Sequence, residues 1–83
     1  MKVNLRYFAS IRETLGHGSE SLETTAPTLA ALRDELIARG GAYAESLARG
    51  RAVRVALNQT MADEAAPLGD GAEVAFFPPV TGG

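Results

Sequence analysis

Apolar and polar residues alternate from residue 2 to residue 8, which predicts a strand with one buried face. Its apolar positions are Val3, Leu5 and Tyr7. Phe8 breaks the alternation, because it places an aromatic ring on the polar face. We expect a short helical turn over residues 9–15 and a second strand over residues 19–25, paired with the first as a hairpin.

The apolar spacing changes from that of a strand to that of a helix at residue 29. Thr28 suits the N-cap, and the following apolar residues recur at helical intervals. They are Leu29, Leu32, Leu36 and Ile37. This pattern predicts a helix over residues 29–39 that ends at Gly40-Gly41. Its charged residues are interpreted as a solvated face, made of Arg33, Asp34, Glu35 and Arg39.

Shorter elements fill the second half of the chain. We expect a short helix over residues 43–49, a strand over 53–57, a turn at Asn58-Gln59 and a short return strand over 60–62. Asp63-Glu64 is interpreted as the start of a helical turn, and Gly69-Asp70-Gly71 as a tight turn. Residues 73–77 form the last strand, with Val74 and Phe76 facing the core and Phe77 pointing outward.

This order of elements predicts an α+β domain over residues 1–77. One main helix packs across a mixed sheet of about five strands. Residues 78–83 then form a protruding tail.

Composition narrows the chemistry that the chain can perform. The sequence holds no cysteine, which excludes disulfides and thiolate metal sites and is typical of a reducing compartment. The net charge of −2 indicates no general attraction to nucleic acid. No apolar run approaches the ~20 residues that span a bilayer, and the chain leads directly into a strand pattern. We therefore expect a cytoplasmic protein without a signal peptide and without membrane or nucleic-acid partners.

The candidate catalytic side chains are few. His17 is the single histidine, and it is interpreted as part of a solvated loop between two glycines. The acidic pair Asp63-Glu64 has no base or nucleophile beside it in the sequence. We expect no bound metal and no bound cofactor.

The C-terminal segment is the chain's most unusual feature. It reads Pro78-Pro79-Val80-Thr81-Gly82-Gly83. The prolines stiffen it, and glycine leaves its tip narrow. Six extended residues reach roughly 20 Å, which is enough to enter the active site of another protein.

Three segments resemble the small, sulfur-carrying subunit of molybdopterin synthase. They are the tail with its preceding Phe76-Phe77, the N-terminal run Tyr7-Phe8-Ala9-Ser10-Ile11-Arg12-Glu13, and Ala56-Leu57-Asn58-Gln59. That family has the ubiquitin-like β-grasp fold. The resemblance implies that an adenylating, E1-like enzyme consumes ATP to activate the Gly83 carboxylate. A sulfur donor then converts it to a thiocarboxylate, and the large synthase subunit transfers the sulfur to a cyclic pyranopterin phosphate.

An outer apolar face is expected to bind the partner together with the tail. Phe8 and Phe77 fall on the polar side of their strands, and Met61 follows the adjacent turn. The predicted partner-binding set is Phe8, Arg12, Met61, Phe77, Pro78, Pro79, Val80, Thr81 and Gly82, with Gly83 as the reacting residue. The alternative for the aromatic residues is burial after a strand end, and Arg12 could instead form an exposed ion pair.

Three alternative functions are also consistent with the sequence. The same Gly-Gly chemistry would serve a sulfur carrier for thiamine or another thiolated product. A ubiquitin-like modifier would join Gly83 to lysines of its targets. A plain interaction domain would leave the tail inert.

Overall fold

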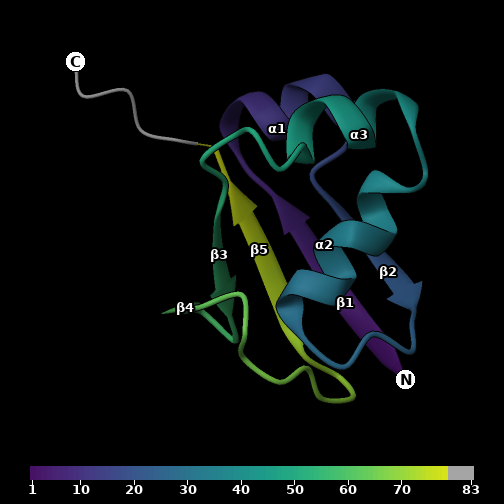
Figure 1. Ribbon diagram of the computed structural model, residues 1–83, viewed down its shortest axis with the longest axis vertical. Coiled ribbons are helices and arrows are strands. Elements are labelled where there is room, and N and C mark those ends of the chain that lie inside the picture. The colour runs from purple at the N-terminus through teal and green to yellow at the C-terminus, as the bar shows by residue number, and fades with distance from the viewer. Residues whose placement is uncertain (79–83) are drawn as a thin grey trace.

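Five strands form one mixed sheet in the computed structural model, which describes residues 1–78. Their spatial order is β2-β1-β5-β3-β4 (Figure 1). In chain order the elements are β1 (Lys2–Tyr7), α1 (Ala9–Leu15), β2 (Ser19–Glu23), α2 (Leu29–Ile37), α3 (Gly41–Leu47), β3 (Arg54–Leu57), β4 (Thr60–Ala62) and β5 (Glu73–Phe77). The predicted α+β class with a mixed sheet is confirmed, and the arrangement is that of the β-grasp fold.

The two central strands, β1 and β5, are parallel, and the other neighbouring pairs are antiparallel. In Figure 1 both central strands point toward α1 and α3, so the last described residues leave the sheet at that end. The register places Tyr7 beside Phe76 and Leu5 beside Val74. Sequence segments about 70 residues apart thus form the middle of the sheet.

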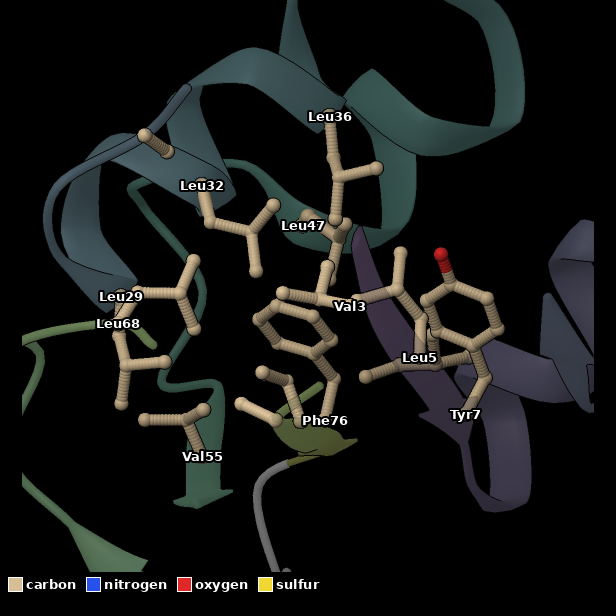
Figure 2. Close-up of a cluster of buried hydrophobic side chains, with 14 residues drawn as sticks. Val3, Leu5, Tyr7, Leu29, Leu32, Leu36, Leu47, Val55, Leu68 and Phe76 are labelled. Carbon is tan, nitrogen blue, oxygen red and sulfur yellow. The ribbon is translucent and has the colours of Figure 1, made fainter. Parts of the chain in front are cut away.

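The core lies between the sheet and α2. The alternating residues of β1 are fully buried, and so are the three leucines of the apolar stripe of α2, while Ile37 is partly buried against them (Figure 2). Phe76 and Val74 of β5 complete the layer. Burying side chains of this size contributes about 1.5–3 kcal/mol each. The amphipathic patterns read from the sequence therefore correspond to real core faces.

The residues at the ends of the helices agree with the sequence prediction, except at the end of α2. The Thr28 hydroxyl accepts a hydrogen bond from the Ala31 N–H, so the predicted N-cap is confirmed. Gly16 ends α1 with a φ of 84°, a conformation that glycine adopts without strain. The predicted end of α2 was wrong, because the helix stops at Ile37 with Ala38 as its cap. Gly40 instead precedes α3, at a φ of 76°.

Two predicted connections also differ from the structure. Strands β1 and β2 are antiparallel as expected, but α1 lies between them, so they do not form a tight hairpin. Asp63 and Glu64 do not start a helix. The Asp63 carboxylate accepts from the Ala65 N–H, which closes a local turn in place of a helical one.

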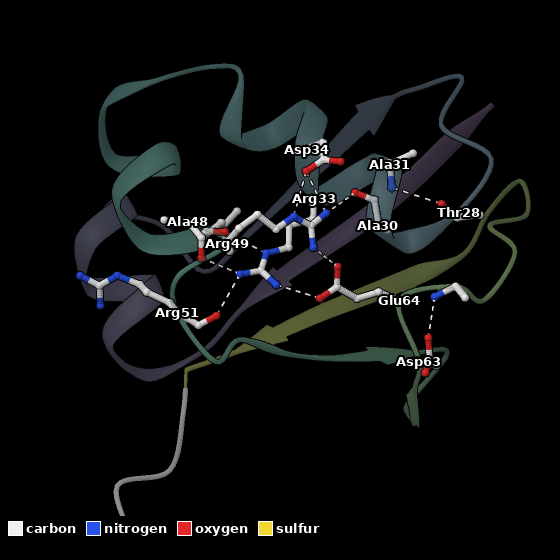
Figure 3. Close-up of polar contacts among 12 residues, drawn as sticks. Thr28, Ala30, Ala31, Arg33, Asp34, Ala48, Arg49, Arg51, Asp63 and Glu64 are labelled. Atoms are coloured by element: carbon white, nitrogen blue, oxygen red, sulfur yellow. Dashed lines mark hydrogen bonds and ion pairs between the residues drawn. The ribbon is translucent and has the colours of Figure 1, made fainter.

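Arg33 is buried, which corrects the interpretation of its helix face as solvated. Only 4% of this residue is exposed. Its guanidinium donates to the carbonyls of Leu47, Ala48 and Arg51 and to the Glu64 carboxylate, at 2.7–3.2 Å (Figure 3). The arginine thus ties α2 to the connection between α3 and β3 by satisfying carbonyls that no strand or helix pairs.

The other charged residues of α2 and its end also have partners. Asp34 pairs with Arg49 at 2.8 Å, and Arg39 pairs with Glu20 at 3.0 Å. Glu35 accepts from the Thr24 hydroxyl. The charged residues that the sequence assigned to a solvated face therefore mostly form contacts with other elements of the fold.

None of the helices formed by residues 1–78 has the length and apolar character needed to cross a membrane.

Candidate partner-docking face

The face of the sheet opposite α2 carries an apolar area beside the end of β5. Because strand side chains alternate, the buried Val55 and Phe76 place Ala56, Ala75 and Phe77 on this outer face. In Figure 1 α2 lies across the inner face of the sheet, and α1 and α3 lie at the end toward which β1 and β5 point. The outer face is therefore uncovered by any helix of the described part of the chain.

Phe8 and Phe77 form a stacked pair on this face. Their ring centroids are 4.7 Å apart and the ring planes differ by 9°. Phe8 is 36% exposed and Phe77 is half-buried. The expectation that Phe77 points away from the core agrees with this position. A stacked and still exposed aromatic pair is the type of group that anchors protein interfaces.

Met61 lies on the same face, two strands away from the aromatic pair. The register places it beside Ala56, which in turn lies beside Ala75. Met61 is 50% exposed. The two alanines are small and nearly buried, and they lie between the aromatic pair and the methionine. The five side chains therefore form one continuous apolar surface. We name this set of five residues the outer apolar face: Phe8, Ala56, Met61, Ala75 and Phe77.

Arg12 lies on α1, outside the outer apolar face. Its side chain packs over Gly18, where a Cβ would meet the guanidinium Nε at 3.0 Å. It forms no ion pair with a carboxylate of residues 1–78. The structure thus does not bring Arg12 together with the aromatic pair.

The predicted tail enters the described structure at Pro78 alone. Pro78 borders a cavity of about 60 Å³ with Ser46 and Arg51, next to α1. This volume suits about two water molecules and no larger ligand. The other predicted site residues, Pro79, Val80, Thr81, Gly82 and Gly83, lie outside the described residues.

His17 belongs to a polar cluster, which corrects its interpretation as a plain loop residue. Glu20 Oε2 accepts from the hydroxyls of Tyr7 and Tyr43, at 2.9 and 2.5 Å, and lies 3.0 Å from His17 Nε2. Arg39 donates to Oε1 at 3.0 Å and stacks over the Tyr43 ring. Sequence reasoning missed this cluster because its members come from four separate segments.

The pKa values of Glu20 and Tyr7 do not suit acid–base catalysis at neutral pH. Burial by itself raises the pKa of Glu20, but hydrogen bonds led by those from Tyr43 and His17 outweigh burial and lower the pKa to about 2. Burial, with the hydrogen bond to Glu20, raises the pKa of Tyr7 well above its ordinary value. Catalytic groups work best with a pKa near the operating pH. The Glu20 carboxylate connects β2 with β1 and α3 through its hydrogen bonds to Tyr7 and Tyr43.

Sequence reasoning also missed two arginines beside the outer apolar face. Arg6 places its guanidinium 5.9 Å from the centre of the Phe8 ring, and Arg54 lies opposite Phe77 in the register. The strand parity already put both residues on the polar side. Which strands would be neighbours was not available from the sequence.

Comparison with known proteins places the chain in a family. Residues 5–83 match the ThiS family. The chain is 41% identical over 81 residues to the molybdopterin synthase sulfur carrier subunit of Escherichia coli (strain K12), covering 98% of this chain and 99% of that protein. It is 40% identical, with the same coverage, to the subunit of that name from Haemophilus influenzae (strain ATCC 51907 / DSM 11121 / KW20 / Rd).

A solved structure supports the same assignment. The fold matches a chain in the protein–protein complex of subunits 1 and 2 of molybdopterin-converting factor from Helicobacter pylori 26695, with a TM-score of 0.70 and 28% identity over the full length of both chains. The chain belongs to the ThiS family of ubiquitin-like β-grasp proteins. The resemblance drawn from the three sequence segments is confirmed.

Proposed function

We propose that this protein is the sulfur carrier subunit of molybdopterin synthase, and that it acts as a protein cosubstrate without catalytic residues of its own. The observation that carries the proposal is the outer apolar face at the end of β5. It puts an exposed aromatic pair where the chain continues into residues 78–83, so a protein bound there would also meet the tail. The relatives at about 40% identity bear the name of this subunit.

The proposed chemistry takes place at the Gly83 carboxylate. At neutral pH a carboxylate is ionised and unreactive, because its ordinary pKa is about 3.3–3.7. An adenylating enzyme joins it to the AMP part of ATP and releases pyrophosphate. A sulfur donor then displaces AMP and leaves the thiocarboxylate. Transfer of that sulfur to the cyclic pyranopterin phosphate is completed by water, which supplies the oxygen that returns Gly83 to the carboxylate, and two such transfers supply the two sulfurs of the dithiolene. The described residues contain no group of three or more His, Asp or Glu side chains that could hold a metal ion.

The proposed partner contacts divide between two regions. Phe8, Met61 and Phe77 provide the apolar contact, and residues 78–82 carry Gly83 into the large subunit's active site. Arg12 lies at the same end of the molecule, on α1, and is proposed to contact the partner beside this area. Binding that positions the terminal atom converts sulfur transfer into an effectively unimolecular step. We place this exchange in the cytoplasm.

A reconstitution experiment tests the proposed function. The protein is incubated with ATP, a matching adenylating enzyme and a sulfide source, and its intact mass is measured. We expect the mass to rise by the difference between sulfur and oxygen, and fragmentation to place the change at Gly83. Addition of the large subunit and the pterin precursor should restore the original mass and yield the dithiolene product.

Variants at the tip test the steric part of the proposal. We expect Gly83→Ala to slow the transfer about a hundredfold, because a misplaced methyl group displaces the reacting atom in a narrow channel. A variant with one added C-terminal residue should not react even when its new end is sulfurated chemically. Normal turnover by this extended variant would contradict the channel. A covalent protein conjugate at Gly83 would indicate a modifier, and an unchanged mass would indicate an inert tail.

A further inference from the structure

Two arginines flank the outer apolar face, one on each side of β5. Arg6 lies on β1 beside Ala75, and Arg54 lies on β3 opposite Phe77. Both residues are exposed and follow the outward parity of their strands. Neighbouring side chains on one face of a sheet stand about 5 Å apart, so both positive charges border the aromatic pair.

Neither arginine is paired with a carboxylate of residues 1–78. Over the same range, Arg33, Arg39 and Arg49 all form ion pairs at the helical side of the molecule. The charges that stabilise the fold are thus separated from the two that border the outer apolar face. Arg6 and Arg54 have no part in the polar contacts that hold the domain together.

Two carboxylates of the same face lie at the opposite end of the strands, whereas that of Asp63, one residue past β4, lines the same surface hollow as Arg54 without forming an ion pair with it. Glu73 is at the start of β5 beside Asn4, and Glu23 is at the end of β2 beside Lys2. Arg6 and Arg54 border the other end, where β5 finishes. A protein of net charge −2 therefore presents a locally positive border around its exposed aromatic pair.

We propose that acidic side chains of the synthase's large subunit lie on both sides of the Phe8–Phe77 contact and pair with Arg6 and Arg54. This inference rests on the proposed function, and it specifies the chemistry of the partner surface. A stacked aromatic pair alone permits many rotations about the contact. Two positive charges on opposite sides of the pair restrict the permitted rotations, and with them the direction in which residues 78–83 approach. Charges at the edge of an interface chiefly increase the association rate, and this increase becomes smaller as the salt concentration rises.

The test measures association and dissociation rates with the purified large subunit at about 50 mM and about 500 mM salt, where screening differs strongly. The variants are Arg6→Gln, Arg54→Gln and the double variant. Lys2→Gln is the matched control, because it removes one positive charge from the far end of the same strand as Arg6. Phe77→Asp tests the aromatic contact, since it removes the ring that stacks on Phe8. Circular dichroism of every variant serves as the control that it is folded.

We expect the double variant to associate about tenfold more slowly at low salt, with a small change in its dissociation rate. At high salt its association rate should approach that of the unaltered protein, and Lys2→Gln should match the unaltered protein throughout. Wild-type rates for the double variant at both salt concentrations would overturn the inference, provided that Phe77→Asp still weakens binding. An equal loss in Lys2→Gln would also overturn it, because the effect would then follow net charge.

The remaining outcomes would identify a different protein that binds beside Arg6 and Arg54. If the arginine variants slow binding to the adenylating enzyme and leave the large subunit unaffected, the border recognises that enzyme and the inference is wrong. If they change only self-association, it recognises a second copy, and the inference is again wrong. If the unaltered protein does not bind the large subunit at all, the proposed function fails, a result distinct from failure of the arginines alone.

Discussion

Glu20 is the residue whose environment differs most from its appearance in the sequence. It lies in a strand of mostly polar residues, yet four side chains converge on its carboxylate. These hydrogen bonds stabilise the charged form against the cost of burial, and they lower the pKa to about 2. A carboxylate with a lowered pKa stabilises the folded protein only while it is ionised.

This linkage predicts how stability depends on pH. The contribution of Glu20 is fully present above its ordinary pKa of 4.5 and is lost as the pH falls toward 2. We expect Glu20→Gln to lower the free energy of unfolding by about 1–2 kcal/mol at pH 7, after allowance for solvent screening. Urea denaturation at pH values from 7 to about 2 measures the difference, which should shrink below pH 4.5.

Glu23→Gln is the matched control for this prediction. Glu23 is on the same strand, but its side chain is 77% exposed and lies 3.8 Å from the N-terminal amine. We expect Glu23→Gln to change the free energy of unfolding only slightly, without the pH dependence expected of Glu20→Gln. A pH-independent difference between wild type and Glu20→Gln would show that packing, and not the charge of Glu20, is responsible.

At the scale of elements, α2 combines two functions on one short helix. Its leucines bury against the sheet, while Arg33 reaches across to the connection that follows α3. Glu64 joins this network through Arg33 and Arg49. Burial alone raises the pKa of Glu64, but the hydrogen bonds from these two arginines lower it overall. The helix thus determines the path of the chain into β3, which lies beside the end of β5.

We expect Arg33→Met to destabilise the domain by about 3 kcal/mol. Methionine can fill the space of the arginine stem, but the Leu47 carbonyl and the Glu64 carboxylate lose a partner, and the carbonyls of Ala48 and Arg51 keep only their backbone partners. Denaturant unfolding measures the loss. The control is Arg51→Met, because the Arg51 side chain is exposed and its carbonyl can still accept from Arg33. Equal stability of Arg33→Met and wild type would mean that water replaces the guanidinium at these carbonyls.

At the scale of the whole molecule, folding and the proposed chemistry belong to different parts of the chain. The hydrophobic core is built from residues between Val3 and Phe76. Gly82 and Gly83 have no side chain to bury. The domain can therefore present the tail without depending on its last residues for stability.

We expect deletion of Gly82-Gly83 to leave the melting temperature within about 2 °C of wild type, because a change of 1 kcal/mol would shift it by about 4–8 °C in a domain of this size. The same deletion should abolish sulfur transfer. Differential scanning calorimetry and the reconstituted synthase assay measure the two effects. A large fall in the melting temperature would indicate that these glycines contact the folded domain.

The sequence by itself determined the elements whose signals are local. Alternation predicted β1, helical spacing and Thr28 predicted α2, and the Gly69-Asp70-Gly71 turn predicted the start of β5. Each of these depends on residues within a few positions of one another, so periodicity and capping are sufficient to identify them. The terminal motifs likewise indicated the family.

Only the tertiary structure decided the positions of the polar side chains. Arg33 looked solvated because its partners are carbonyls more than ten residues away, which no spacing rule detects. His17 looked isolated because Tyr43 is brought to it by α3. The pairing of Phe8 with Phe77, and of Arg54 with the same face, required β1, β5 and β3 to be neighbours. Side chains far apart in sequence meet only when the order of strands is set, and that order depends on which apolar faces of the whole chain are buried together.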